Sequence, residues 1–241
     1  MEDKPDATIS VVVPSLNEKE ALLECVQQLV DRNDIDEIII VDSSKSRTMC
    51  DFYQNQFFAL KDLKERLIVI GCTQQARSLQ MNIGAELASG TFVLFLHADT
   101  SLPKIDLKNL FTNKFVKLNW GFFRVQLDGS EVWKFVLQTC MSYRARLTGI
   151  ATGDMCIFVR NDTWKQYGPF GDIPLMEDID LCSRLRKFSK PYIVSSPVIT
   201  SARRWRQRGV GRTILEMWKL RLMFWRGVPI QRIRQIYQNE N

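Results

Sequence analysis

The sequence lacks the features that mark several large classes of protein. Its six cysteines include no Cys-x-x-Cys pair and follow no secretory signal, so we expect reduced, mostly buried thiols and a cytoplasmic protein. No apolar run approaches the roughly 20 residues that cross a bilayer, which argues against a membrane-spanning protein. Neither Gly-x-Gly-x-x-Gly after the first expected strand nor Gly-x-x-x-x-Gly-Lys-Ser/Thr occurs. A Rossmann-type dinucleotide site is therefore disfavoured, and a P-loop is excluded.

Positive charge is unevenly distributed along the 241 residues. Residues 203–241 hold ten Lys or Arg against two Asp or Glu, a net charge of +8, whereas residues 1–202 hold 23 against 25, a net charge of −2. The overall charge of +6 therefore belongs to the tail, which argues against a basic body that binds nucleic acid. We expect the tail to meet phosphates, lipid head groups or an acidic partner.

Short apolar runs alternate with amphipathic stretches over the first hundred residues. This rhythm predicts an α/β fold with a mostly parallel sheet and right-handed crossovers. We expect Asn17 to cap the first helix, and Leu79, Ile83 and Leu87 to face inward from the second. The expected strands are 8–13, 37–41, 67–70, 92–96, 120–127, 155–160, 192–194 and 198–200, and later helices are expected over about 76–87, 106–118, 130–143 and 176–187.

Acidic residues directly follow two of the apolar runs. Asp99 comes after the run 92–96, and Asp42 comes after the run 37–41. The carboxyl ends of parallel strands form the edge where open α/β sheets bind ligands, so Asp99 can hold a metal-bound phosphate there. A carboxylate in this place can equally cap the next turn. The residues alone leave both interpretations open.

Three carboxylates occupy the start of the helix expected over 176–187: Glu177, Asp178 and Asp180. Acidic residues in a first turn match the helix dipole, which is an ordinary structural role. Three in four residues exceed what this matching needs, and Asp and Glu are frequent general bases. The sequence is compatible with dipole matching and with a catalytic carboxylate.

The basic tail opens on Arg203, Arg204 and Trp205. The planar guanidinium of arginine suits two-point binding of phosphate, and a neighbouring tryptophan can stack on a sugar or a base. The alternative is a solvated basic turn in which Trp205 anchors the core. The apolar stretch 210–225, with Lys and Arg between its apolar residues, predicts an amphipathic helix that lies on a membrane surface or packs on its own domain.

Six short motifs occur in order: Pro14-Ser15-Leu16-Asn17-Glu18, Val41-Asp42-Ser43-Ser44, His97-Ala98-Asp99, Gly153-Asp154, Met176-Glu177-Asp178 and Arg203-Arg204-Trp205. In this order, over about residues 8–230, the chain resembles family 2 glycosyltransferases with a GT-A fold. The stretches 80–85, 95–100 and 200–205 are similar to those of a small subgroup named for arsenosugar biosynthesis.

The resemblance implies a metal-dependent, inverting transfer of a sugar from a nucleotide-diphosphate sugar to a hydroxyl acceptor. Asp178 matches the general base, with Glu177 beside it, and Asp99 matches the acid that holds Mg²⁺ or Mn²⁺ on the diphosphate. The residues implied in nucleotide-sugar binding are Pro14 and Glu18 beside the base, Asp42 on the uracil or ribose, Arg77 near the ribose or diphosphate, and Asn17, His97, Gly153, Asp154, Arg203, Arg204 and Trp205.

The chain departs from the family's pattern at two motifs. His97 stands where the first acid of Asp-x-Asp would be, and its imidazole either binds the metal or the sugar or is a satisfied residue at the sheet edge. Ser43 stands where the family usually has glycine, and Lys45 adds a cation near the base pocket.

The same resemblance implies a Rossmann-like mixed, mostly parallel sheet flanked by helices in residues 1–202. Its nucleotide-binding half covers about 8–100 and its acceptor half about 101–202, while residues 203–241 form a basic amphipathic helical tail packed on the domain. The acceptor is a small molecule or is lipid-linked, no nucleic acid partner is expected, and a homodimer is compatible with the sequence.

Two other functions fit the same residues. The first is a polyprenyl-phosphate sugar transferase, with peripheral membrane contact through the basic tail. The second is a catalytically weak adaptor that binds a nucleotide sugar, suggested by the missing first acid at His97.

Overall fold

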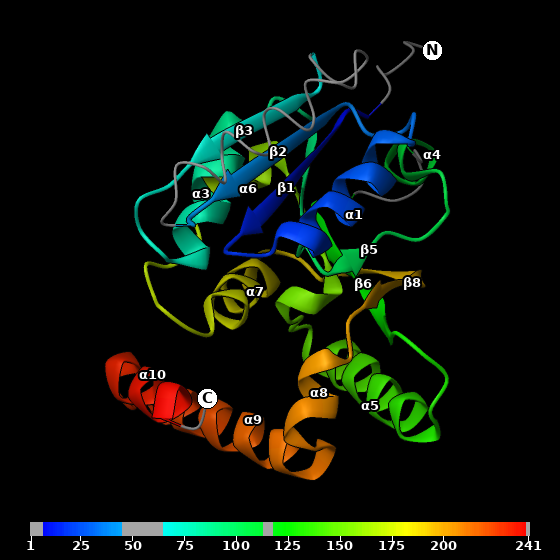
Figure 1. The fold of residues 1–241 in the computed structure, drawn as a ribbon. Helices are drawn as coiled ribbons and strands as arrows, with labels where there is room; N and C mark the ends of the chain where they lie inside the picture. The colour runs from blue at the N-terminus through cyan, green and yellow to red at the C-terminus, as the bar shows by residue number, and fades with distance from the viewer. Residues whose placement is uncertain (1–6, 45–64, 113–117, 240–241) are drawn as a thin grey trace.

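The computed structural model describes residues 7–44, 65–112 and 118–239, apart from the side chains of Arg204, Gln238 and Asn239. The predictions made for Lys45 and Cys50, and for the side chain of Arg204, therefore lie outside the described residues. Figure 1 shows a twisted sheet with helices against both of its faces and a helical C-terminal segment below it.

Eight strands of the described residues form one mixed sheet in the order β3-β2-β1-β4-β7-β6-β8-β5. The strands β3, β2, β1 and β4 are mutually parallel, whereas β7 is antiparallel to both of its neighbours and β6 is parallel to β8. The α/β prediction with a mixed, mostly parallel sheet is confirmed. The strands are β1 Ile9–Ser15, β2 Glu37–Asp42, β3 Leu67–Gly71, β4 Phe92–Phe95, β5 Thr100–Ser101, β6 Trp120–Leu127, β7 Ile157–Arg160 and β8 Tyr192–Thr200.

Helices connect the strands and cover both faces of the sheet. Residues of α1 and α4 belong to the apolar cluster on one face, and residues of α3, α6 and α7 belong to the cluster on the other. The helices are α1 Lys19–Val30, α3 Arg77–Leu87, α4 Leu107–Thr112, α5 Val132–Thr148, α6 Asn161–Tyr167, α7 Glu177–Phe188, α8 Arg203–Arg208, α9 Val210–Trp225 and α10 Ile230–Asn239, with a 3₁₀ turn over Gly153–Met155.

The central strand β1 is buried on both faces. Val11 and Val13 pack into one apolar cluster, and Val12 packs into the other, because successive side chains of a strand point to opposite faces. Full burial of a Val, Leu, Ile or Phe side chain stabilises a fold by roughly 1.5–3 kcal/mol. The sheet edge reached by β1 and β4 is therefore a rigid platform for the polar residues that follow.

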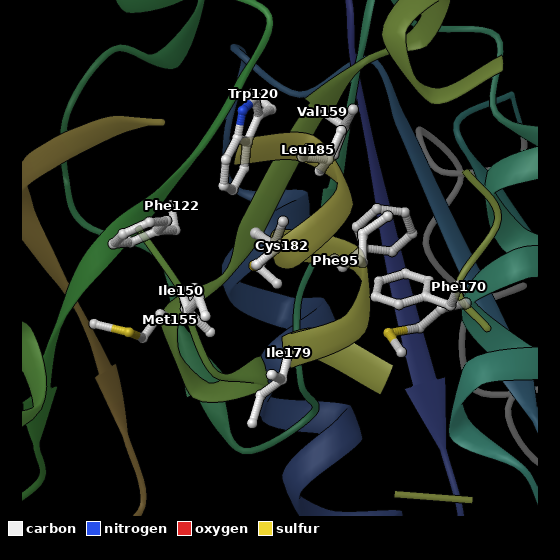
Figure 2. Packing of buried hydrophobic residues seen from close by; sticks show 14 of the residues in the cluster. Phe95, Trp120, Phe122, Ile150, Met155, Val159, Phe170, Ile179, Cys182 and Leu185 are labelled. Carbon is white, nitrogen blue, oxygen red and sulfur yellow. The ribbon is translucent and has the colours of Figure 1, made fainter. Parts of the chain in front are cut away.

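The second cluster fixes helix α7 against the sheet. Ile179, Cys182 and Leu185 of α7 lie beside aromatic residues of the sheet (Figure 2) and are almost fully buried. Phe95 contributes to this cluster through an edge-to-face contact with Phe170, with ring centroids 4.9 Å apart. The position of the acidic first turn of α7 is thus set by core packing.

Two local predictions are wrong. The inward face expected for α3 is wrong at Leu87, which is 43% exposed, whereas Ile83 does pack, partly buried, against the second cluster. The buried positions of the helix include Met81, Gly84 and Ala85. The small residue at 84 allows this close packing, since a Cβ there would lie 2.3 Å from Cγ1 of Val12. Asn17 does not cap α1: Glu18 holds the cap position, and Asn17 has a left-handed backbone with φ of 57° whose N–H donates to Oγ of Ser44 at 2.9 Å.

The C-terminal helices α9 and α10 are amphipathic and pack side by side (Figure 1). Leu220 of α9 and Ile233 of α10 are fully buried in the second apolar cluster, whereas Trp218 and Trp225 are 64% and 59% exposed. Among the helices that the structure describes, none combines the length and the apolar character needed to cross a bilayer.

Candidate active site

One large cavity of about 620 Å³ lies beneath the carboxyl ends of β1 and β4. Helices α3, α5, α7, α8, α9 and α10 all contribute residues to its walls. The residues expected from the sequence that line it are Pro14, Glu18, Arg77, His97, Asp99, Gly153, Asp154, Glu177, Asp178, Arg203 and Trp205. The structure therefore brings together residues that are as many as 191 positions apart in the chain.

Glu18 and Asp99 reach this cavity from neighbouring parallel strands. Strand β1 pairs with β4 so that Val12 lies opposite Phe95, and the polar segments that follow both strands emerge at the same edge. Burial raises the pKa of Glu18, and the negative charge of Asp99 raises it further, against the opposing effects of Arg77, His97 and Arg203. A cation at this edge would relieve the repulsion between the two carboxylates.

Glu18 and Asp99 would suit a divalent cation only if further ligands came from a bound molecule or water. Among the described residues, no three His, Cys, Asp or Glu side chains form a group able to hold a metal by themselves. Asp99 and Glu18 supply hard oxygen donors, which suit Mg²⁺ or Mn²⁺, and both ions readily take further ligands from a substrate phosphate and water.

His97 is packed against the segment that carries Asp154. The side chain of His97 is 12% exposed, and its Nδ1 lies 3.5 Å from Oδ1 of Asp154. The imidazole also lies against Gly153 through its Cε1 and Nε2 atoms, which would be 2.4 Å and 2.5 Å from a Cβ at that position. This packing explains why a residue without a side chain stands at 153, and His97 also lines the cavity.

The carboxylate of Asp178 is held by two backbone amides. Its Oδ2 accepts a hydrogen bond from the N–H of Gly153 at 2.9 Å, and its Oδ1 accepts one from the N–H of Ile179 at 2.7 Å. Burial raises the pKa of Asp178, although these two hydrogen bonds oppose the shift. Burial also raises the pKa of Glu177, and the neighbouring charge of Asp178 adds to that shift. Both groups thus have the raised proton affinity that suits a general base.

Asp180 has a different environment from the other two acids of α7. Its Oδ2 accepts a hydrogen bond from Nη2 of Arg184 at 2.9 Å, one turn further along the helix, and Asp180 does not line the cavity. The ion pair accounts for Asp180 alone, so Glu177 and Asp178 stay the candidates for a catalytic carboxylate. Asp180 forms an ordinary intrahelical ion pair, whereas Glu177 and Asp178 face the cavity.

Arginines face these carboxylates from two sides. Desolvation acts to lower the pKa of Arg77, yet its pKa is raised overall because Glu177, Asp154 and Asp178 surround it with negative charge. Arg203 lies at the first turn of α8 and contributes positive charge near Glu18. Trp205 lines the cavity and also packs on a small apolar cluster.

Asp42 and Asn17 do not line the cavity formed by the described residues. Asp42 is 2% exposed. Its carboxylate accepts one hydrogen bond from the N–H of Ser44 at 3.2 Å and another from the Ser44 hydroxyl at 2.9 Å. Ser43, where glycine was expected, is buried and donates its N–H to the carbonyl of Ser15 at 2.9 Å. Asp42 thus stabilises the turn after β2.

Sequence reasoning missed the wall of the cavity that helices α5 and α9 form. In both helices an arginine follows apolar cavity residues at helical spacing. This pattern was the sequence signal for the wall, because an arginine on an otherwise apolar face is costly to bury and so indicates a cavity. The residues missed on this wall are Leu137, Cys140, Met141 and Arg144 of α5 and Thr213, Ile214, Met217, Trp218 and Arg221 of α9, together with Tyr237 of α10.

Residues 10–117 match the family described as Glycosyl transferase family 2. The chain is similar to the PGL/p-HBAD biosynthesis glycosyltransferases of Mycobacterium bovis and Mycobacterium tuberculosis, with 36% identity over 98 residues, 40% of this chain. It spans 37% of the length of these relatives. Their names support the family and not the arsenosugar subgroup.

Solved structures share the fold at low sequence identity. A mannosyltransferase from Pyrobaculum calidifontis, determined in complex with GDP-Man and Mn²⁺, superposes with a TM-score of 0.58 and 15% identity over 83% of this chain and 60% of its own. TarS of S. aureus superposes with a TM-score of 0.59 and 18% identity over 80% of this chain and 36% of its own. The fold is GT-A-like.

Proposed function

We propose that the chain is an inverting glycosyltransferase that moves a sugar from a nucleotide-diphosphate sugar to a hydroxyl acceptor. The observation that carries the proposal is that the carboxylates after β1 and β4 line the same cavity as those at the start of α7. The family match of residues 10–117 supports the same activity. The family match does not depend on the cavity. Composition alone therefore does not account for the presence of the motif residues in the cavity walls.

The donor would occupy the end of the cavity near Glu18 and Asp99. Arg77 and Arg203 lie where they can meet the negative diphosphate, with Asp99 as the principal metal-holding residue. A bound Mg²⁺ or Mn²⁺ would neutralise charge that develops on the diphosphate as it leaves. The GDP-Man and Mn²⁺ in the mannosyltransferase structure support this class of donor and of cation.

Asp178 would act as the general base on the acceptor. Its two amide hydrogen bonds fix the carboxylate, and its raised pKa strengthens it as a base relative to a solvated aspartate. As the acceptor oxygen bonds to the anomeric carbon, Asp178 takes the hydroxyl proton and the bond to the nucleoside diphosphate breaks. A single displacement of this kind inverts the anomeric carbon.

A second candidate is the same transfer to a lipid-linked acceptor at a membrane surface. Large apolar side chains are exposed on α5 and α9, two helices that line the cavity, and α9 also carries the exposed cations Arg212 and Lys219. Phe135, Val136, Trp218 and Trp225 are 57–67% exposed. Apolar and basic residues together on one helical surface favour contact with anionic lipid.

Calorimetric titration of nucleoside diphosphates, with Mn²⁺ and with chelator, tests the donor site. We expect metal-dependent binding of one nucleotide to the wild type and at least a tenfold weaker affinity for Asp99→Ala. The control is Asp162→Ala, which removes an exposed carboxylate of α6 outside the cavity. Binding that ignores both metal and Asp99 would overturn the assignment of Asp99, and binding without any sugar transfer would favour the adaptor.

A further inference from the structure

Two arginines from different helices line the acceptor side of the cavity. Arg144 belongs to α5 and Arg221 belongs to α9, and both side chains are half-buried. Each follows apolar cavity residues on its own helix, at positions three, four and seven residues earlier. The two helices therefore present the same arrangement, an apolar surface that ends in a guanidinium group.

Arg144 is oriented by the protein but is incompletely satisfied. Its Nη1 donates to the carbonyl of Ile150 at 3.1 Å, which fixes the plane of the guanidinium. Its Nη2 is buried and has no hydrogen-bond partner among the described residues. Buried polar atoms without a partner are rare in proteins because they lose their contact with water and gain nothing in return. A ligand that supplies an acceptor here would remove that cost.

The charges around the pair also favour an added anion. Desolvation lowers the pKa of Arg144 to about 10, and the positive charge of Arg221 acts in the same direction. The pKa of Arg221 is likewise lowered by desolvation. Asp178 opposes the shift in both arginines, but its carboxylate oxygens already accept two backbone hydrogen bonds. Asp154 also acts on Arg221, so these carboxylates offset part of the positive charge, and an added anion would interact with the remainder.

We propose that Arg144 and Arg221 form an anion-binding subsite that holds a phosphate monoester group of the acceptor. The inference rests on the proposed function and specifies its acceptor class: a hydroxyl compound that carries a phosphate, with an apolar portion. The planar guanidinium matches phosphate oxygens in two-point contacts. Leu137, Met141 and Ile214 provide the apolar surface beside it. In this arrangement the acceptor hydroxyl lies next to Asp178 while its phosphate is bound by the arginines.

Phenyl phosphate serves as the soluble probe in calorimetric titrations of the full chain. Excess nucleoside diphosphate and Mn²⁺ are present, so that the phosphate-binding groups at the donor end are occupied. We expect Arg144→Met and Arg221→Met each to weaken the Kd for phenyl phosphate at least tenfold, because each removes charge-assisted hydrogen bonds to the anion. Arg146→Met and Arg212→Met are the matched controls, since both remove an exposed arginine from the same helices outside the cavity.

Vesicles distinguish a soluble phosphate ester from a lipid head group. Flotation is measured with phosphatidylcholine vesicles that contain phosphatidic acid, a phosphate monoester, and with vesicles of equal charge that contain phosphatidylglycerol, a diester. Stronger flotation on phosphatidic acid that both Met variants lose would identify the anion as a lipid head group. If the two Met substitutions weaken binding of phenyl phosphate but leave flotation unchanged, the acceptor is a soluble phosphate ester. Either result supports the subsite.

The inference fails if phenyl phosphate and phosphatidic acid bind the wild type and both Met variants equally, or bind none of them. Nucleotide affinity and thermal denaturation of each variant are measured on the same samples, which shows that the variants are folded. Absence of nucleotide binding in the wild type would instead overturn the proposed function, and this result is separate from the phosphate titrations. Arg144→Lys adds a further check, because it keeps the charge and loses the planar two-point contact.

Discussion

The contact between Gly153 and His97 provides a quantitative test of how the site is built. A Cβ at 153 would lie 2.4 Å from Cε1 and 2.5 Å from Nε2 of the imidazole, whereas ordinary contacts begin near 3.4 Å. Gly153→Ala therefore forces the ring or the 3₁₀ turn to move by about 1 Å. Overpacking of this size costs roughly 1–3 kcal/mol of unfolding free energy.

The same substitution also disturbs the proposed base. The N–H of Gly153 donates to Oδ2 of Asp178 at 2.9 Å, and a displaced turn weakens this bond. Hydrogen bonds to a charged group contribute about 1.5–3 kcal/mol, so part of that amount adds to the loss. We expect Gly153→Ala to lower both stability and the rate of sugar transfer.

A double-mutant cycle with His97→Ala isolates the contact. Removal of the imidazole opens the space that the new methyl group needs, so the double variant should be less destabilised than the sum of the single variants by about 1–3 kcal/mol. Urea unfolding measures all four proteins. Gly211→Ala is the control, because a Cβ there meets nothing within 4 Å. Additivity of the two changes to within about 0.5 kcal/mol would refute the reasoning.

Two further predictions concern the acids of α7. Asp178→Asn should lower kcat for sugar transfer by about 10²–10⁴-fold. In the wild type, kcat should fall as pH drops through the raised pKa of Asp178, which a pH–rate profile measures; an unchanged rate in the variant would exclude Asp178 as the base. Glu177→Gln should stabilise the fold at neutral pH, because the folded-state pKa of Glu177 is raised and its ionisation opposes folding as pH rises through that value. The gain in Tm over the wild type should shrink in acid, and a gain independent of pH would contradict this account.

Much of the proposed donor site could be predicted from the sequence. An apolar run that ends in an acid, as 92–96 does before Asp99, predicts a carboxylate at the carboxyl edge of a parallel sheet because strand direction fixes which end meets the ligand. The acids of α7 were recognisable for a similar reason, since a helix start rich in carboxylates exceeds the needs of its dipole. The spacing of Asp178 and Asp180 on a helix also places them on different faces, as the structure shows.

Tertiary packing decided the rest. Asp42 follows its strand just as Asp99 does, yet its carboxylate accepts hydrogen bonds from Ser44 while Asp99 lines the cavity, and only the three-dimensional course of the turn distinguishes the two. Arg144 and Arg221 are 77 residues apart and meet only because α5 and α9 pack around one cavity. Local sequence determines periodicity and strand direction, since both depend on neighbouring residues. Which distant side chains share a cavity depends on how the helices pack, and that is a property of the whole fold.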